Sequence, residues 1–345
     1  MKQAAFGFLL ALSTALSILP AAFGELPSSP GDLALFPAVK SGKVVYIDNT
    51  GTIRIPGGFD AGDYFHKNRA VVSRGNRYGY IDGTGKMVIE PRFEFATSFA
   101  GEGGLAPVLF PFEPPLSGDN RWGFIDASGK TVIAPRFDAA SPFFEGLACV
   151  RLGSLWGYVD PNGVLRIAPQ FASASGFREG RAAVRIADKW GFIDNAGTVV
   201  IEAVYDGAMP FSEGLAIVKR DNKWGFVDRA GKVVIPPRYA HGGSFLEGLA
   251  AVFRRERYGF IDARGVERIQ PMFSQVESFN EGLAPVLVGG NWGFIDNTGK
   301  MVIPAQFEAV GGFLRGLSSI RFRDGENVIL GYIDRNGKLV WPPLR

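Results

Sequence analysis

Short apolar stretches separated by turn-forming residues recur along almost the whole chain. The pentapeptide Trp-Gly-Phe-Ile-Asp, or a variant of it, occurs at 44–48, 78–82, 122–126, 156–160, 190–194, 224–228, 258–262, 292–296 and 330–334. From Trp122 to Trp292 the interval is constant at 34 residues. A fixed period of about 20–50 residues indicates tandem copies of one supersecondary unit. The sequence therefore predicts nine copies of one such unit.

Each unit contains three short segments with the composition of β-strands. The Trp-Gly-Phe-Ile segment is joined to a Val-Val-Ile run by an Asp-x-x-Gly turn, in which the Asp side chain can bond backbone amides and Gly accepts positive φ. A proline such as Pro135 ends the second segment, because it cannot donate to a sheet ladder. The third segment follows a Phe-x-Glu-Gly turn, as at 215–218. No window after the N-terminal segment keeps a helical period, so we expect an all-β domain of three-stranded units.

The first aromatic of each unit is the expected contact between neighbours. A unit of this size with three short strands cannot bury enough apolar area to fold alone, so the copies must stack on one another. We expect the stacking contacts to be made by Tyr78, Trp122, Trp156, Trp190, Trp224, Tyr258 and Trp292. Val44 and Leu330 replace the aromatic in the first and last copies, which predicts atypical terminal units.

The repeat pattern leaves two arrangements open. We expect an open, twisted, solenoid-like array, because nine blades exceed the four to eight that are usual for propellers. The alternative is a closed, propeller-like ring. In that arrangement 35–39, which matches a third strand without its unit, would pair with 330–341 and complete the last unit, so that both sheet edges are hidden.

These residues resemble a known family. The tandem Trp-Gly sequences, together with Phe-Ile-Asp, Asp-x-x-Gly and Phe-x-Glu-Gly-Leu, are similar to the WG-repeat (KWG) family of bacterial β-repeat proteins, over nearly all of residues 33–345. The resemblance implies a tandem β array, often in exported proteins, that mediates binding. It brings no catalytic residues with it.

The composition argues against several classes of function. Lys and Arg total 37 and Asp and Glu total 34, a net charge of +3, so we expect no nucleic-acid partner. A single cysteine, Cys149, and two histidines, His66 and His241, leave no material for a disulfide framework or a typical zinc site. We therefore expect no metal and no cofactor.

The N-terminus has the pattern of a secretory signal. Lys2 precedes an apolar run from Ala4 to Ile18, which is shorter than the roughly 20 residues of a transmembrane helix. Small residues before Glu25 then predict cleavage after Gly24. We expect a signal peptide at 1–24, a short leader at 25–32 and the WG-repeat β domain at 33–345. The mature protein should be periplasmic or secreted, with no transmembrane segment.

The recurrent acidic residues are better explained by structure than by chemistry. The Asp of each Asp-x-x-Gly turn could be imagined as part of a cation-binding ring, but a turn role explains its position. The Glu before each turn glycine recurs at 145, 179, 213, 247 and 281, whereas an active site needs one asymmetric constellation. Lys67 and Arg315 stand at the same position in other copies. We expect no catalytic residues.

Two departures from the repeat are candidates for binding. An insert at 110–119 carries Phe110 and Phe112 among prolines, and a basic turn carries Arg254, Arg255 and Arg257. Both could also be tolerated loop variation, although specificity in repeat arrays comes from such loops. We expect an exported, non-enzymatic binding or scaffold protein that engages a protein or a cell-envelope polymer. A carbohydrate-active or other envelope enzyme is the alternative, and the oligomeric state stays open.

Overall fold

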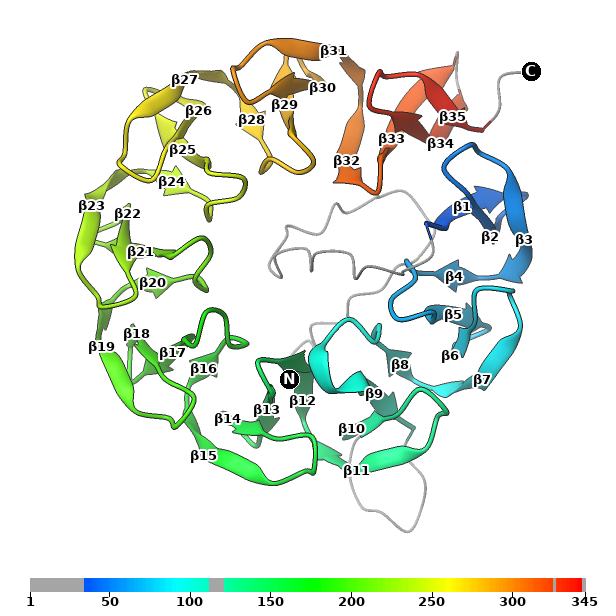
Figure 1. The fold of residues 1–345 in the computed structure, drawn as a ribbon, viewed down its shortest axis with the longest axis horizontal. Coiled ribbons are helices and arrows are strands. Elements are labelled where there is room, and N and C mark those ends of the chain that lie inside the picture. The colour runs from blue at the N-terminus through cyan, green and yellow to red at the C-terminus, as the bar shows by residue number, and fades with distance from the viewer. Residues whose placement is uncertain (1–33, 112–120, 325–326, 343–345) are drawn as a thin grey trace, which may run out of the picture.

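Nine antiparallel β-sheets are arranged as blades in a ring in the computed structural model, which describes residues 34–111, 121–324 and 327–342 (Figure 1). The chain visits the blades in order, and the last blade lies beside the first. The all-β prediction is confirmed. The expected open array is wrong, because the domain is a closed nine-bladed β-propeller. The predicted signal peptide and leader lie outside the described residues.

The strands are numbered in chain order, and we number the blades 1 to 9. Blades 1 to 3 consist of β1 (Phe36–Lys40), β2 (Lys43–Ile47) and β3 (Ile53–Phe59); β4 (Ala61–Gly62), β5 (Ala70–Arg74), β6 (Arg77–Ile81) and β7 (Met87–Phe93); β8 (Phe95–Ala96), β9 (Ala106–Phe110), β10 (Arg121–Ile125) and β11 (Thr131–Phe137). Blades 4 to 6 consist of β12 (Ala139–Phe144), β13 (Leu147–Leu152), β14 (Leu155–Val159) and β15 (Leu165–Phe171); β16 (Ser173–Ala174), β17 (Ala182–Ile186), β18 (Lys189–Ile193) and β19 (Val199–Tyr205); β20 (Gly207–Ala208), β21 (Leu215–Arg220), β22 (Lys223–Asp228) and β23 (Val233–Tyr239).

Blades 7 to 9 consist of β24 (His241–Gly242), β25 (Ala250–Arg254), β26 (Arg257–Ile261) and β27 (Glu267–Phe273); β28 (Gln275–Val276), β29 (Leu283–Val288), β30 (Asn291–Asp296) and β31 (Met301–Phe307); β32 (Ala309–Leu314), β33 (Leu317–Asp324), β34 (Asn327–Asp334) and β35 (Leu339–Trp341). A short 3-10 helix, η1 (Glu102–Gly104), precedes β9. Among the described residues, no helix is long and apolar enough to cross a membrane.

A blade is not the same segment of chain as one sequence repeat. In blade 6, Lys219 of β21 pairs with Trp224 of β22, and Trp224 pairs in turn with Tyr239 of β23. The strand after each Glu-Gly turn therefore joins the two strands of the following repeat. Blades 2 to 9 also have a fourth strand at the inner edge, such as β20, where a spacer was expected (Figure 1). The three-stranded expectation holds for blade 1 alone among the described residues.

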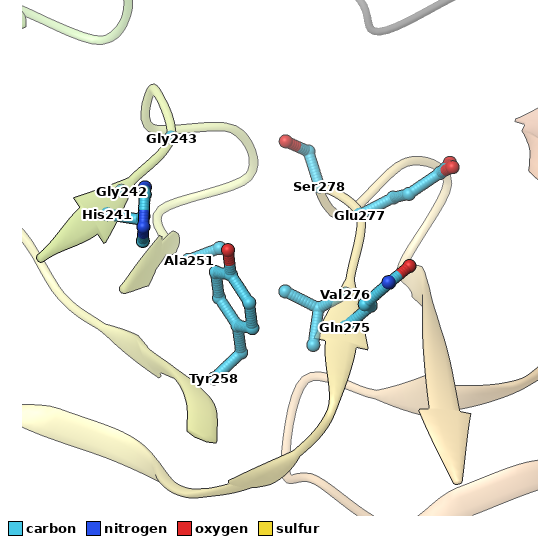
Figure 2. A pocket seen from close by; sticks show the side chains of 9 residues that line it. All are labelled: His241, Gly242, Gly243, Ala251, Tyr258, Gln275, Val276, Glu277 and Ser278. Carbon is cyan, nitrogen blue, oxygen red and sulfur yellow. The ribbon is translucent and has the colours of Figure 1, made fainter. Parts of the chain in front are cut away.

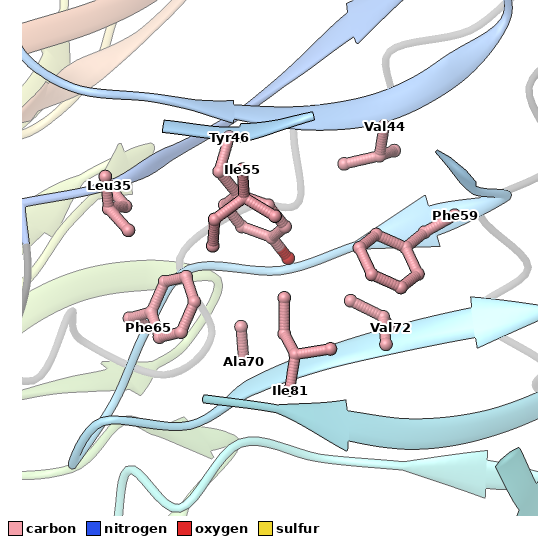
Figure 3. Packing of buried hydrophobic residues seen from close by; sticks show 9 residues of the cluster. All are labelled: Leu35, Val44, Tyr46, Ile55, Phe59, Phe65, Ala70, Val72 and Ile81. Atoms are coloured by element: carbon pink, nitrogen blue, oxygen red, sulfur yellow. The ribbon is translucent and has the colours of Figure 1, made fainter. Parts of the chain in front are cut away.

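Apolar side chains from two consecutive blades fill each interface. Between blades 1 and 2 these are Leu35, Val44, Tyr46, Ile55, Phe59, Phe65, Ala70, Val72 and Ile81 (Figure 3). Because strand side chains alternate between faces, every blade presents one apolar row to the blade before it and another to the blade after it. The core of the domain is thus divided into interfaces rather than gathered in one centre.

One buried aromatic pair recurs in every interface between consecutive blades from blade 1 to blade 9 but not, within the described residues, at the seam where blade 9 meets blade 1. Phe192 packs against Phe211 of the next blade with 5.0 Å between ring centroids, and both rings are buried. Seven further pairs at 4.9–5.2 Å are Tyr46–Phe65, Tyr80–Phe99, Phe124–Phe143, Tyr158–Phe177, Phe226–Phe245, Phe260–Phe279 and Phe294–Phe313. The residue that interlocks the blades most deeply therefore lies two positions after the Trp of the repeat.

The ring closes without a strand shared between the ends. β1 pairs with β2 inside blade 1, with Val39 opposite Val44, instead of joining the last blade. The seam between blades 9 and 1 is sealed by buried side chains, namely Phe36, Ala38, Val45, Ile47, Leu317, Tyr332 and Trp341. The Tyr332 hydroxyl also donates to the Pro37 carbonyl across the seam at 2.9 Å. Strand pairing between 35–39 and 330–341, as the ring alternative had it, does not occur.

Trp341 is the residue that adapts the last blade to this seam. It stands in β35 where β31 has Ile303, and it is 6% exposed. In blade 8 the residue four positions after Ile303 is the buried Phe307, whereas the sequence has Arg345 four positions after Trp341. A larger side chain at the isoleucine position supplies apolar bulk that the missing aromatic would otherwise give. The terminal units are thus atypical, as Val44 and Leu330 predict, but each has a neighbour across the seam.

Candidate functional site

The aspartates of the Asp-x-x-Gly turns are engaged by their own turns. Asp194 Oδ1 accepts from the backbone N–H groups of Ala196 at 3.0 Å and Thr198 at 2.9 Å. Gly197 closes the turn with φ of 85°, a conformation that favours glycine. In blade 2 a hydrogen bond from the Thr84 hydroxyl lowers the pKa of Asp82 below its usual value. The predicted turn role is confirmed.

The glutamates of the Glu-Gly turns link neighbouring blades. Glu213 and Gly214 have φ of 54° and 81°, which is the geometry of a two-residue type I′ hairpin. Glu213 Oε2 then accepts from the Gly248 N–H of the next blade at 2.9 Å. Equivalent bonds run from Gly180 to Glu145, Gly214 to Glu179, Gly282 to Glu247 and Gly316 to Glu281. These five carboxylates are structural links.

Cations continue this chain of links where the repeat lacks a glutamate. Lys67 Nζ donates to the Gly101 carbonyl at 2.6 Å. Arg315 of blade 9 donates through its guanidinium to the Phe65 carbonyl at 3.1 Å, so it reaches blade 2 at the ring closure. At the other turns the partner group is an N–H, which a glutamate can accept from. At these two turns the partner group is a carbonyl, which needs a donor, and this explains why a basic residue replaces the acid.

The repeat aromatics are half-buried at the rim of each interface. Cationic side chains accompany two of them, with Arg151 and Lys219 each 5.9 Å from the ring centroid of Trp156 and Trp224 respectively. The remaining members of the predicted set, Tyr78, Trp122, Trp190, Tyr258 and Trp292, have the same partial burial. Each ring is therefore only partly covered by its neighbours.

Of the two aromatic residues in the predicted insert, the structure describes Phe110. Phe110 is the last residue of β9, where it pairs with Arg121 and packs against Phe93 at 5.3 Å. It is therefore a half-buried interface residue and not part of an exposed loop, because it occupies the position where this strand ends in other blades, as Arg74 does opposite Arg77 in blade 2. Phe112 lies outside the described residues.

The predicted basic turn is a two-residue hairpin at the tip of blade 7. Arg255 and Glu256 connect β25 to β26, with φ of 51° and 64°. Arg254 forms an ion pair with Glu267 at 2.5 Å, and Arg257 donates to the Ser274 hydroxyl at 2.7 Å. Arg254, Arg255 and Arg257 are all exposed.

A pocket lies beside this blade, in the interface between blades 7 and 8 (Figure 2). Its volume is about 320 Å³, near the lower limit for small-molecule sites. Its lining consists of His241, Gly242, Gly243, Ala251, Tyr258, Gln275, Val276, Glu277 and Ser278. In Figure 2, Tyr258 and Ala251 stand on one side, with Val276 and Ser278 opposite them. The innermost strands β24 and β28 place it at the inner edge of the ring.

A local change of residues explains the pocket. Tyr258 stands where most blades have the larger Trp. Tyr78 of blade 2 is also a tyrosine, but Phe95 of the next blade packs against it at 5.3 Å. The residue at the Phe95 position opposite Tyr258 is Gln275. Tyr258 instead contacts Phe253 at 4.8 Å, and Phe253 contacts His241 at 5.7 Å. The joint occurrence of Tyr258 and Gln275 was the signal in the sequence for this pocket, which sequence reasoning missed.

The pocket offers recognition groups rather than a metal site. Its polar side chains are a phenol, an imidazole, an amide, a hydroxyl and the single carboxylate of Glu277. Within the described residues, no group of three or more His, Cys, Asp or Glu side chains is placed to hold a metal ion. The buried thiol of Cys149 has a raised pKa because of its desolvation, so it is a packing residue in the interface of blades 4 and 5.

Comparisons with known proteins agree with this architecture. A family model described as the WG-containing repeat matches residues 46–78, 78–110, 122–156, 156–190, 190–224, 224–255, 258–292 and 292–325. No curated protein matches the chain.

One solved structure resembles the ring in fold, and two others match with lower scores. A structure described as the eukaryotic initiation factor is 10% identical, with a TM-score of 0.65, over 88% of this chain and 94% of that one. Kluyveromyces lactis Hsv2p is 9% identical with a TM-score of 0.38, over 55% and 71%. PorZ of Porphyromonas gingivalis is 10% identical with a TM-score of 0.30, over 87% and 52%. The first likeness supports the fold and says nothing about the activity of this chain.

Proposed function

Because this chain belongs to the family of proteins built from WG-containing repeats, we propose that it is an exported, non-enzymatic binding scaffold that engages a protein or a cell-envelope polymer. One observation carries the proposal. The repeated aspartates and glutamates are engaged by turns and blade links, whereas the pocket beside Tyr258 departs from the repeat, which supports a role in recognition. Specificity in repeat scaffolds comes from such departures on a common frame.

The residues of the pocket favour binding over hydrolysis. Glycoside hydrolysis requires two carboxyl groups on opposite sides of the scissile bond, about 5 to 10 Å apart. Glu277 is the one carboxylate among the lining residues, and Figure 2 shows its side chain directed away from Tyr258. The aromatic face of Tyr258 beside hydroxyl and amide groups suits a polar ligand with apolar patches, such as a segment of protein or glycan.

The proposal of export rests on the first 24 residues, whose charged, apolar and small-residue regions have the order of a signal peptide. Fractionation of the producing cells tests it. We expect the protein in the periplasm or the medium, with an N-terminus at Glu25 by Edman sequencing. Recovery of an uncleaved chain from the cytoplasm would contradict export.

A binding experiment tests the pocket. The mature protein and a Tyr258→Trp variant, which restores the repeat residue and fills the space, are immobilised and exposed to solubilised envelope extract. We expect a protein or polymer that binds the parent and is lost in the variant, whereas a Trp224→Tyr control in blade 6 retains it. Equal retention by all three would remove the pocket from the proposal. Release of new reducing ends from envelope glycans would show an enzyme instead.

A further inference from the structure

An ion pair recurs at the hairpin tips of the blades. It joins the first residue of the Trp-Gly strand to the acidic residue that follows the outer strand, 17 positions later. In blade 5 these are Lys189 and Asp206, at 2.5 Å. The same pair occurs in blades 1, 2 and 3, as Lys43–Asp60, Arg77–Glu94 and Arg121–Asp138. The pair is thus part of the repeat, although no single motif shows it.

The acid of this pair also holds the tip of the next blade. Asp206 Oδ2 accepts from the Asp221 N–H at 3.0 Å. Asp60 and Asp138 do the same for the N–H groups of Gly75 at 2.7 Å and Gly153 at 2.6 Å. At these three tips the carboxylate is therefore held by one cationic side chain and one backbone N–H, which together form a small carboxylate receptor.

Blades 6 and 7 keep the cation of this receptor and lack the acid. Lys223 stands at the basic position of blade 6, and the acidic position is Ala240. In blade 7 the corresponding residues are Arg257 and Ser274. The other departures are different in kind.

In blade 4 the base and the acid are lost together, as Leu155 and Ala172. Blade 8 has Asn291 at the basic position, and its acid, Glu308, bonds Arg323 of blade 9 instead. Among blades 1 to 8, a base without its acid thus occurs at two adjacent tips.

Further positive charge surrounds these two tips. Arg220 and Arg255 are exposed beside Lys223 and Arg257 respectively. Acidic residues at the tips are Asp221 and Glu256, while Glu267 is occupied by Arg254. By sequence position, the N–H groups that would meet the absent carboxylates are those of Arg255 and Gly289.

We propose that the tips of blades 6 and 7 bind an acidic peptide segment of a partner protein, whose carboxylates take the places that Asp206 and Asp60 hold in other blades. This inference rests on the proposed function and names the class of partner. The receptor geometry selects carboxylates, because each position has one cation and one N–H and is built around an aspartate elsewhere in the same ring.

Restoring the repeat tests this inference. The double variant Ala240→Asp/Ser274→Asp gives both tips their own carboxylates. A fluorescein-labelled peptide of alternating Asp and Gly residues is titrated against each protein, with fluorescence anisotropy as the readout. We expect the parent to bind with an affinity that falls as NaCl rises, and the double variant to bind at least tenfold more weakly. Its melting temperature should be equal or higher, because the repeat bonds are restored.

A matched control adds charge without filling a receptor. Ala172→Asp in blade 4 places the same carboxylate beside Leu155, so peptide affinity should stay within about twofold of the parent. Equal peptide binding by the parent and the double variant would overturn the inference. So would polyphosphate that binds the parent more tightly than the peptide does and binds the double variant equally well. If an envelope ligand binds both proteins equally, this inference fails and the proposed function stands. If no envelope ligand binds the parent, the proposed function fails irrespective of the peptide result.

Discussion

The interface between blades 5 and 6 and the seam between blades 9 and 1 bury aromatic rings in different ways. In the interior interface, Phe192 packs against Phe211, and Glu179 links the two turns. At the seam, Tyr332 packs against Phe36 with 5.6 Å between centroids and bonds the Pro37 carbonyl. The interior interface is packed by residues that recur in the repeat, whereas the seam is packed by residues that replace the usual ones at repeat positions. Closure of this ring is therefore a property of particular side chains and not of an exchanged strand.

The largest effect should come from removing Trp341, because it is the residue that adapts blade 9 to blade 1. We expect Trp341→Ala to lower the free energy of unfolding by about 3–5 kcal/mol, as for other buried aromatics. In addition the seam should part, which increases the radius of gyration. Urea unfolding and small-angle X-ray scattering measure the two effects.

Ile303→Ala is the matched control for the seam, since Ile303 occupies the same strand position in the interior. It should lower stability by about 2–5 kcal/mol and leave the radius of gyration unchanged. If Trp341→Ala also leaves the radius unchanged, the ring is held closed by other contacts and the distinction between seam and interior is wrong.

The sequence predicted the local structure better than the closure. The Asp-x-x-Gly turns, the three longer strands and the stacking of copies follow from short-range pattern, because each depends on residues close together in the chain. The two-residue inner strands have no pattern of their own, since Gly207 and Ala208 pair only because β21 lies beside them. Closure depends on how many blades, each rotated by the same angle from the last, complete a circle. Phe36 and Trp341 indicate closure, but only once it is known which residues lie next to them.

The candidate site shows the same limit. Arg255 was identifiable as part of an exposed basic turn, because a two-residue hairpin between two strands must lie at a tip. Phe110 was misplaced, because it ends β9 at the same position as Arg74 ends β5, so the departure from the repeat begins only after it. The pocket beside Tyr258 and the absence of an acid 17 positions after Lys223 and Arg257 are visible only as differences between equivalent positions. Those equivalences become certain once the strands are paired.

A second prediction separates the two aromatics of the interior interface. Phe192→Ala should lower the free energy of unfolding by about 3–5 kcal/mol, because the ring is fully buried against Phe211. Trp190→Ala should lower it by about 1–2 kcal/mol, because the indole is half-buried at the rim. Urea unfolding curves of both variants give the comparison. A larger loss of stability in Trp190→Ala than in Phe192→Ala would mean that the tryptophan of the repeat, and not Phe192, makes the main contact between blades.

Acid should weaken the interior and the seam alike, because both contain the same aspartate turns. Hydrogen bonds from Ser128 lower the pKa of Asp126, and bonds within its turn lower the pKa of Asp48 to about 2 despite an opposing desolvation. A folded-state pKa below the usual value of about 4 stabilises the protein fully above pH 4. This stabilisation is lost as the pH falls from about 4 toward 2.

Urea midpoints at pH 7, 4 and 2.5 measure this loss. We expect little change between pH 7 and 4 from these groups and a fall between pH 4 and 2.5. In an Asp126→Asn variant the fall should be smaller, because the amide keeps an acceptor in the turn and does not titrate. The difference between Trp341→Ala and Ile303→Ala should persist at pH 4. A midpoint that rises on acidification would contradict the turn assignment.

The smallest expected effect concerns the glutamate links, which distinguish interior interfaces from the Arg315 contact at the closure. Glu213 has φ of 54°, a conformation that is unfavourable for a residue with a Cβ, yet its carboxylate accepts from the Gly248 N–H. Glu213→Ala loses the bond and keeps the strain, so stability should fall by about 1–2 kcal/mol. Glu213→Gly loses the bond and relieves the strain, so it should lie within about 1 kcal/mol of the parent.

Hydrogen exchange at Gly248 separates the bond from the strain. Its amide should exchange faster in both Glu213 variants than in the parent, while the amide of Gly282, which donates to Glu247, keeps its rate. An unchanged rate at Gly248 would mean that the carboxylate does not hold this N–H in solution. The links would then be a consequence of blade packing, and the glutamate would need another reason to occupy a position that glycine or asparagine fills more easily.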